Sequence, residues 1–202
     1  DGAITDATRR AGWFTSPGSR REVHRLRAGS DAVAVGSETA LTDDPQLTVR
    51  EVAPPRVPPQ RVVFDSRLRL PLSSRLARTA GQIPTIVVRT RTVEPHSDER
   101  VPALEAAGVR VLTVGSLPEA LRALRNEGIR SMLVEGGAQL AASFLADKVV
   151  DRLIIFQAPV VLGPGSVRAF ADIGGGDFDL IQFHLHVERR SIEQEVKSIP
   201  SK

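Results

Sequence analysis

A carboxylate and two glycines stand together where an apolar run meets a helical pattern. Glu135, Gly136 and Gly137 follow the strand-length run 131–134, and apolar residues then recur at helical spacing over 138–145. Two glycines between a strand and a helix leave the first helical N–H groups free, and these groups attract phosphate together with the helix dipole. The alternative, which a bare glycine pair favours, is a tight turn without a ligand. Glu135 at the end of a strand indicates a contact with a polar substrate.

A second group of polar residues lies earlier in the chain. Residues 37–44, SETALTDD, follow a short apolar run, and we expect them to form a polar turn that Pro45 closes. The aspartates of this turn indicate either chemistry or plain turn formation. Arg27 and Arg50 flank the region and could clamp a phosphate bidentately. The residues alone therefore predict a nucleotide-dependent enzyme with a phosphate turn, an anion clamp and two carboxylates.

The composition excludes several kinds of chemistry. The 202-residue chain contains no cysteine, which excludes disulfides, thiolate catalysis and cysteine-based zinc sites and makes the cytoplasm the expected location. A GxSxG nucleophile motif is absent. His184 and His186 share one face of a predicted strand, but no carboxylate motif accompanies them, so a half-exposed strand is favoured over a metal site. His24 is expected to be solvated, and no metal is expected.

The charge pattern bears on the partners of the chain. The formal net charge is +3, and subtracting the three lysines from the 27 basic residues leaves 24 arginines, which suit phosphate recognition. These arginines are scattered, and aromatic residues make up only 4% of the chain, so nucleic-acid binding is not supported. No apolar run reaches the length of a membrane span. The expected partner is therefore a small phosphorylated molecule, with no nucleic acid and no membrane.

The remaining pattern predicts the elements that must position these residues. A helix is expected from Ser16, as N-cap, and Pro17 to Ala28. The strand, glycine turn, helix and strand between 131 and 156 predict a βαβ unit, and residues 1–10 are expected to be a loop. The alternating segment 180–187 is expected to pair with 195–199 as an antiparallel C-terminal hairpin beside a mostly parallel sheet. Further strands are expected at 31–36, 61–65, 85–89 and 109–114, and further helices at 103–107 and 117–126.

Six segments together are similar to one known family. They are VHRLRA at 23–28, VG at 35–36 with Thr39, LTDDP at 41–45 with LTVR at 47–50, VFDSRLR at 63–69, LVEGGAQL at 133–140 and APVVLG at 158–163. In this order and spacing they resemble the reductase domain of riboflavin biosynthesis over nearly the whole chain. The resemblance implies a single domain over 1–202 with an α/β, dihydrofolate-reductase-like fold and helices on both faces of the sheet. It also implies that NADPH reduces the ribosyl group of 5-amino-6-(5-phosphoribosylamino)uracil to ribityl by hydride delivery to C1′.

The resemblance implies roles for individual residues. The expected catalytic carboxylates are Asp43 and Glu135. The expected substrate contacts are Arg27, Leu47, Arg50 and Glu135. The expected cofactor contacts are Trp13, Thr39, Asp43, Ser66, Gly136, Gly137, Ala138, Gln139 and Leu140. The basic segment 66–69 could hold the 2′-phosphate of NADPH.

Two departures from the family pattern matter. Ala11 stands where the family has a serine that contacts the substrate, so this contact is lost or is replaced by Arg10. The family's N-terminal strand is also missing before Asp1, which suggests a truncated or partly ordered N-terminus. The resemblance further implies a homodimer and an association with a zinc deaminase whose cysteines this chain lacks. Two alternatives stay open, namely a reductase for another pterin or pyrimidine and a non-catalytic nucleotide-binding module.

Overall fold

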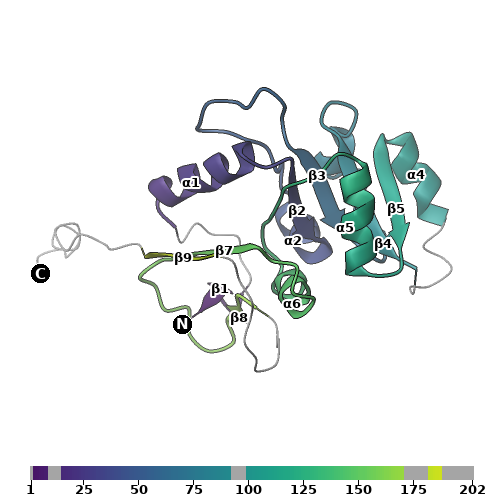
Figure 1. The fold of residues 1–202 in the computed structure, drawn as a ribbon. Coiled ribbons are helices and arrows are strands. Elements are labelled where there is room, and N and C mark those ends of the chain that lie inside the picture. The colour runs from purple at the N-terminus through teal and green to yellow at the C-terminus, as the bar shows by residue number, and fades with distance from the viewer. Residues whose placement is uncertain (1, 9–14, 92–98, 171–181, 188–202) are drawn as a thin grey trace, which may run out of the picture.

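A five-stranded parallel sheet in the order β5-β4-β3-β2-β6 forms the centre of the molecule (Figure 1). The computed structural model describes residues 2–8, 15–91, 99–170 and 182–187. The strands of this sheet are β2 (Ala32–Gly36), β3 (Gln60–Phe64), β4 (Thr85–Thr90), β5 (Val109–Val114) and β6 (Met132–Val134). Each neighbouring pair is parallel, which confirms the predicted parallel sheet.

The strands are apolar because both faces of the sheet are covered. All five residues of β2, AVAVG, are buried, as is usual for a parallel sheet between two helical layers. Successive side chains of a strand point to opposite faces. Val33 and Val35 therefore belong to one hydrophobic cluster, and Ala32 and Ala34 belong to the other.

Helices lie on both faces, as predicted. One face carries α2 (Ser37–Asp43), α3 (Arg75–Arg78) and α4 (Val101–Ala106), and the other carries α5 (Leu117–Asn126) and α6 (Ala138–Ala146). Leu76 and Leu104 are fully buried in the first cluster, and Leu124 is buried in the second. The ring of Phe144 meets that of Phe64 edge-on with 5.5 Å between centroids, which fixes α6 on the same face as α5.

The first helix, α1 (Pro17–Ala28), has the predicted bounds. The Ser16 hydroxyl accepts a hydrogen bond from the Ser19 N–H at 3.1 Å, and Pro17 takes the first helical position, where no N–H is needed. The chain leaves the helix at Gly29, whose N–H bonds the last carbonyls. Capping thus sets both ends of α1. Two of its side chains, His24 and Arg27, bond to residues 50 and 135.

The expected polar turn at 37–44 is wrong, because residues 37–43 form α2. Gly36 is the N-cap with an extended backbone, and the side chain of Ala40 is buried in the core. Packing of Ala40 stabilises this short helix, whose other residues are polar apart from the exposed Leu41. The helix ends at Asp44 (φ 39°, ψ 57°), directly before Pro45, where a right-handed helical conformation is disfavoured.

Two small sheets lie beside the central one (Figure 1). β1 (Ala3–Thr5) pairs antiparallel with β8 (Val167–Arg168), so the expected N-terminal loop is wrong for residues 3–5. β7 (Arg152–Gln157) pairs in parallel with β9 (Gln182–Val187) rather than with the central sheet. The last strand of the predicted βαβ unit is therefore misassigned, since it forms a six-residue ladder with β9 and does not join the central sheet.

The predicted antiparallel hairpin cannot be compared with the fold, because its second arm, 195–199, lies outside the described residues. Its first arm is found as β9. Within the ranges that the structure describes, no helix combines the length and apolar character needed to cross a bilayer.

Candidate active site

Most of the predicted site residues lie at one edge of the central sheet, where its parallel strands end. α2 continues directly from β2, Ser66 follows β3, and Glu135 follows β6. β2 lies between β3 and β6, so these three chain segments meet at the same edge. Ligands of open α/β sheets bind outside the carboxyl ends of the strands.

The glycine turn packs against the start of α2. Gly136 (φ 73°) and Gly137 (φ 90°) both have backbone conformations that disfavour a side chain. A Cβ atom at Gly137 would lie 3.6 Å from the Thr39 hydroxyl and 3.6 Å from the Cβ of Leu140, and one at Gly136 would lie 3.4 Å from the same hydroxyl. Four of the residues expected to bind the cofactor, Thr39, Gly136, Gly137 and Leu140, are therefore brought together.

The N-terminus of α6 is open at this turn. Gly137 is its N-cap, no described side chain caps it, and Ala138 and Gln139 form its first turn. Gln139 is exposed. The free N–H groups and the helix dipole give this end a positive partial charge, which suits a phosphate.

A two-pronged ion pair joins α1 to the end of β6. Arg27 donates from Nε to Glu135 Oε1 and from Nη2 to Glu135 Oε2, each at 2.6 Å. Its Nη1 donates to the Thr48 carbonyl at 2.8 Å. The side chain of Arg27 is 12% exposed and that of Glu135 is 21% exposed, so the pair is shielded from water on most sides. The guanidinium of Arg27 is thus engaged, which leaves Arg50 as the more accessible half of the predicted clamp.

The segment 46–50 crosses the end of α1 and presents Arg50 to solvent. The Arg50 side chain is exposed and donates to Gln46 Oε1 at 3.1 Å, while its main-chain N–H donates to Nδ1 of His24 at 3.1 Å. The expectation that His24 is solvated is wrong, because the residue is 6% exposed. Burial lowers the pKa of His24, and the positive charges of Arg27 and Arg50 lower that pKa further.

Leu47, an expected substrate contact, belongs to the hydrophobic core. It is 2% exposed and packs in the cluster beneath the sheet face that carries α2. Its φ of 52° is unusual for a residue with a large side chain. Its side chain therefore anchors the segment 46–50, and a role in substrate binding would fall to its main chain.

The two aspartates at the end of α2 have different surroundings. Asp44 Oδ1 accepts the main-chain N–H of Arg75 at 2.8 Å, and its other oxygen lies 3.6 Å from Nε of Arg75. In the described part of the chain, nothing pairs with the side chain of Asp43, which is exposed. Partial desolvation of its carboxyl raises the pKa of Asp43. The turn-capping role considered for this pair is thus filled by Asp44, and Asp43 is left available for chemistry.

The two arginines of the basic segment 66–69 have different surroundings. Arg69 bonds Glu38 at 3.1 Å and Ser37 at 2.5 Å, and so holds the first turn of α2. Arg67 is exposed, and the described residues provide it with no partner. Ser66 accepts a hydrogen bond from the Thr90 hydroxyl at 3.0 Å, which fixes it at the ends of β3 and β4.

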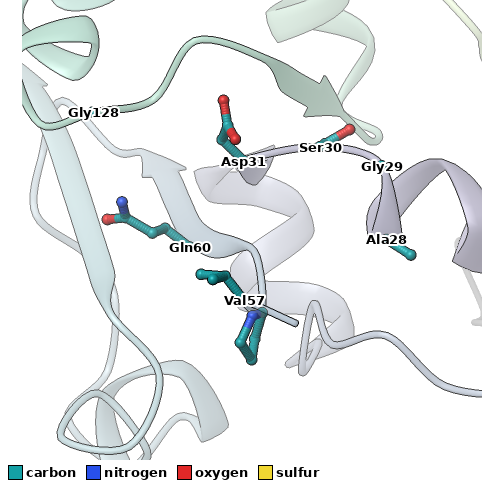
Figure 2. A pocket seen from close by; sticks show the side chains of 8 residues that line it. Ala28, Gly29, Ser30, Asp31, Val57, Gln60 and Gly128 are labelled. Atoms are coloured by element: carbon teal, nitrogen blue, oxygen red, sulfur yellow. The ribbon is translucent and has the colours of Figure 1, made fainter. Parts of the chain in front are cut away.

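A cavity of about 280 Å³ lies at the opposite edge of the sheet, where β2 and β3 begin (Figure 2). Asp31 and Gln60 line it, and none of the predicted site residues does. Asp31 accepts the main-chain N–H groups of Arg130 and Ser131 at 2.9 Å, and these bonds lower its pKa. The Asp31 carboxylate therefore has a structural role, since it binds the main chain just before β6.

Trp13, an expected cofactor contact, lies outside the described residues, as do Arg10, Ala11 and His96 and the side chains of His184 and His186. Over the described ranges, no group of three or more histidine or acidic side chains could hold a metal. His24 is the residue that sequence reasoning missed. Its spacing of three from Arg27 on a predicted helix was the available signal, because such residues share a face.

Comparison with known proteins places nearly the whole chain in one family. The model of the family described as "RibD C-terminal domain" matches residues 1–194. The chain is 34% identical over 195 residues to the riboflavin biosynthesis protein RibD of Aquifex aeolicus, covering 96% of this chain and 51% of that protein. It is 34% identical over 171 residues to the 2,5-diamino-6-ribosylamino-4(3H)-pyrimidinone 5′-phosphate reductase of Archaeoglobus fulgidus, covering 81% of this chain and 77% of that protein.

Solved structures show the same likeness. The Acinetobacter baumannii RibD superposes with a TM-score of 0.65 at 27% identity, over 89% of this chain and 48% of that one. The diaminohydroxyphosphoribosylaminopyrimidine deaminase/5-amino-6-(5-phosphoribosylamino)uracil reductase of Thermotoga maritima gives a TM-score of 0.55 at 30% identity, over 72% and 38% of the two chains. The chain thus spans about half the length of the RibD proteins that it matches over most of its own length.

Proposed function

The chain belongs to the family of RibD C-terminal domains, and from this premise we propose that it is a reductase of riboflavin biosynthesis that uses NADPH. Its substrate is a pyrimidine with a 5-phosphoribosylamino group, which it reduces to the ribitylamino product. The observation that carries the proposal is the meeting, at one edge of the sheet, of an open glycine turn with the Arg27–Glu135 pair. The names of the RibD and pyrimidinone phosphate reductase relatives support the same activity.

The residues at this edge fit a dinucleotide phosphate. The positive φ values of Gly136 and Gly137 let the turn pack closely against Thr39, and the uncapped start of α6 offers N–H groups to an anion. Arg67 has the charge and the exposure to bind a 2′-phosphate, which NADH lacks. NADPH, when bound, supplies the hydride that adds to C1′ of the opened sugar.

The residues of the chain have separable tasks toward the substrate. Arg50 binds the 5′-phosphate, because its guanidinium is exposed and held only by Gln46 among the described residues. Glu135 accepts hydrogen bonds from the substrate, and Arg27 holds its carboxylate in one orientation. Asp43, whose exposed carboxyl has no partner among the described residues, provides or holds the proton that accompanies reduction.

The test is loss of NADPH absorbance with two substrates. One is 5-amino-6-(5-phosphoribosylamino)uracil, and the other is 2,5-diamino-6-ribosylamino-4(3H)-pyrimidinone 5′-phosphate, the compound in the name of the Archaeoglobus relative. Turnover of either supports the activity, and the ratio identifies the substrate before or after deamination. Calorimetric titration with NADPH and NADH accompanies the assay. Cofactor binding without turnover would instead favour the nucleotide-binding module, and absence of binding would refute the proposal.

Arg50 gives a sharper test of the substrate class. A hydrogen bond to a charged group contributes about 1.5–3 kcal/mol, so Arg50→Gln should weaken binding of the phosphorylated substrate about 10- to 150-fold. The loss should appear mainly in KM, because a remote phosphate is held in the ground and transition states alike. Arg56→Gln removes the same charge from an exposed residue of the loop before β3 and is the control. If the wild type and Arg50→Gln prefer the phosphorylated over the dephosphorylated substrate equally, Arg50 is not the anchor.

A further inference from the structure

One face of α1 holds the segment that carries Arg50. His24 and Arg27 are three residues apart and share this face. His24 accepts the Arg50 N–H at 3.1 Å, and Arg27 donates to the carbonyl of Thr48 at 2.8 Å. Two side chains of one helix turn thus bind two main-chain groups of the segment that are two residues apart.

Little else fixes the main chain of this segment. In the part of the chain that the structure describes, these are the only hydrogen bonds to the main chain of 46–50, which lies in no helix or strand. Leu47, near the start of the segment, and Glu51, directly after it, have φ values of 52° and 60°, which are strained for residues other than glycine. The buried side chain of Leu47 anchors one end, and the bond to His24 is the hydrogen bond at the other end, at Arg50 itself.

We propose that His24 is a positioning residue for substrate binding, which orients Arg50 toward the phosphate by accepting its main-chain N–H. This inference rests on the proposed function. Arg27 completes the same face by orienting Glu135, so one helix turn sets both the phosphate contact and the carboxylate contact. His24 itself is buried and acts through Arg50 alone.

The chemistry of the imidazole agrees with this role. Nδ1 accepts a hydrogen bond only when it carries no proton, so His24 acts as the neutral form with its proton on Nε2. The charged groups that face it are Arg27, Arg50, Glu51 and Glu135. Burial and the two arginines outweigh the two carboxylates, and the neutral form that the bond requires is favoured.

The test compares variants with and without an acceptor at this position. His24→Asn places an amide oxygen near the place of Nδ1, whereas His24→Leu and His24→Met have similar apolar bulk and no acceptor. Hydrogen exchange of the Arg50 amide should be faster in the Leu and Met variants and protected in the wild type and the Asn variant. KM for the phosphorylated pyrimidine should rise about 2- to 10-fold in the Leu and Met variants, in keeping with the loss of one neutral hydrogen bond. Their KM for NADPH and for the dephosphorylated substrate should not change, and Asn should restore the phosphate preference.

Several results would overturn the inference. It fails if the Leu and Met variants keep wild-type phosphate preference and Arg50 amide protection. It also fails if both are unfolded while the Asn variant is folded, because His24 would then serve stability rather than positioning. If the wild type turns over neither pyrimidine, the proposed function fails, and the amide exchange of Arg50 still decides whether His24 holds this residue.

Discussion

Replacing Arg27 by methionine is expected to lower the free energy of unfolding by about 2–3 kcal/mol. Methionine keeps much of the aliphatic bulk of arginine and removes all three of its hydrogen bonds. Two of these bonds reach Glu135 at 2.6 Å, and the third reaches the Thr48 carbonyl. The substitution therefore leaves a carboxylate and a carbonyl without partners in a partly buried place.

The magnitude follows from the burial of the pair. Breaking a fully buried ion pair costs about 3–5 kcal/mol, whereas an exposed pair contributes about 0–1 kcal/mol. The side chains of Arg27 and Glu135 are 12% and 21% exposed, so water can reach the abandoned carboxylate only in part. An intermediate value of about 2–3 kcal/mol results, and for a chain of this size it corresponds to a fall in Tm of about 4–12 °C.

Urea unfolding and thermal unfolding measure the effect, and the chain offers a matched control. Arg110 and Glu127 form a pair with the same 2.6 Å distance, but Arg110 is 61% exposed. Arg110→Met should therefore change the free energy of unfolding by less than about 1 kcal/mol. If Arg27→Met and Arg110→Met destabilise the protein equally, burial and two-pronged geometry do not determine the strength of the first pair, and the reasoning is refuted. A double-mutant cycle with Glu135→Gln then isolates the coupling of the pair from other losses.

Three further predictions concern other parts of the site. Gly137→Val should weaken NADPH binding in calorimetry while the protein still folds, because a side chain at φ 90° beside Thr39 and Leu140 displaces the turn that offers N–H groups to the cofactor. Gly81→Ala, where the added atom meets nothing within 4 Å, should bind normally. Asp43→Asn should lower NADPH turnover without changing Tm, whereas Asp44→Ala should cost about 1 kcal/mol of stability through loss of a main-chain bond; the opposite pattern would assign the structural role to Asp43. Burial lowers the pKa of His24 below 6.5, so just below this pH the unfolded chain binds more protons than the native protein. The free energy of unfolding should therefore decrease as the pH is lowered through this window. Urea unfolding at about pH 5–8 should show this slope in the wild type and not in His24→Leu.

The parallel sheet and the longer helices could be predicted from the sequence because their signals are local. The strand 109–114 and the helix 117–126 have the predicted bounds, since apolar runs and capping residues are visible within a few positions. α2 was predicted as a turn because its polar residues disfavour a helix, and the burial of Ala40 is a property of the assembled sheet. The pairing of β7 with β9 likewise joins segments far apart in the sequence, so no local pattern predicts it.

The site shows the same division. The glycine turn after β6 could be predicted from the spacing of apolar residues and glycines. The turn contacts Thr39, another residue expected to bind the cofactor. The partners of Arg27 do not follow from spacing, since the free guanidinium expected for a phosphate clamp is occupied by Glu135. The difference between Asp43 and Asp44 also depends on a contact with α3 that adjacent residues cannot reveal. The roles assigned to the individual site residues stay predictions.

The ion pair between α1 and β6 also constrains the order of folding. Its partners are 108 residues apart, and closing a flexible loop of this length costs about 4 kcal/mol of chain entropy. The contribution of the pair, about 2–3 kcal/mol, does not offset that cost alone. The parallel pairing of β2 with β6 must therefore bring the two ends together before the pair can form. A chain in which β6 has not joined the sheet therefore lacks the carboxylate contact, so this part of the site forms only once β6 pairs with β2.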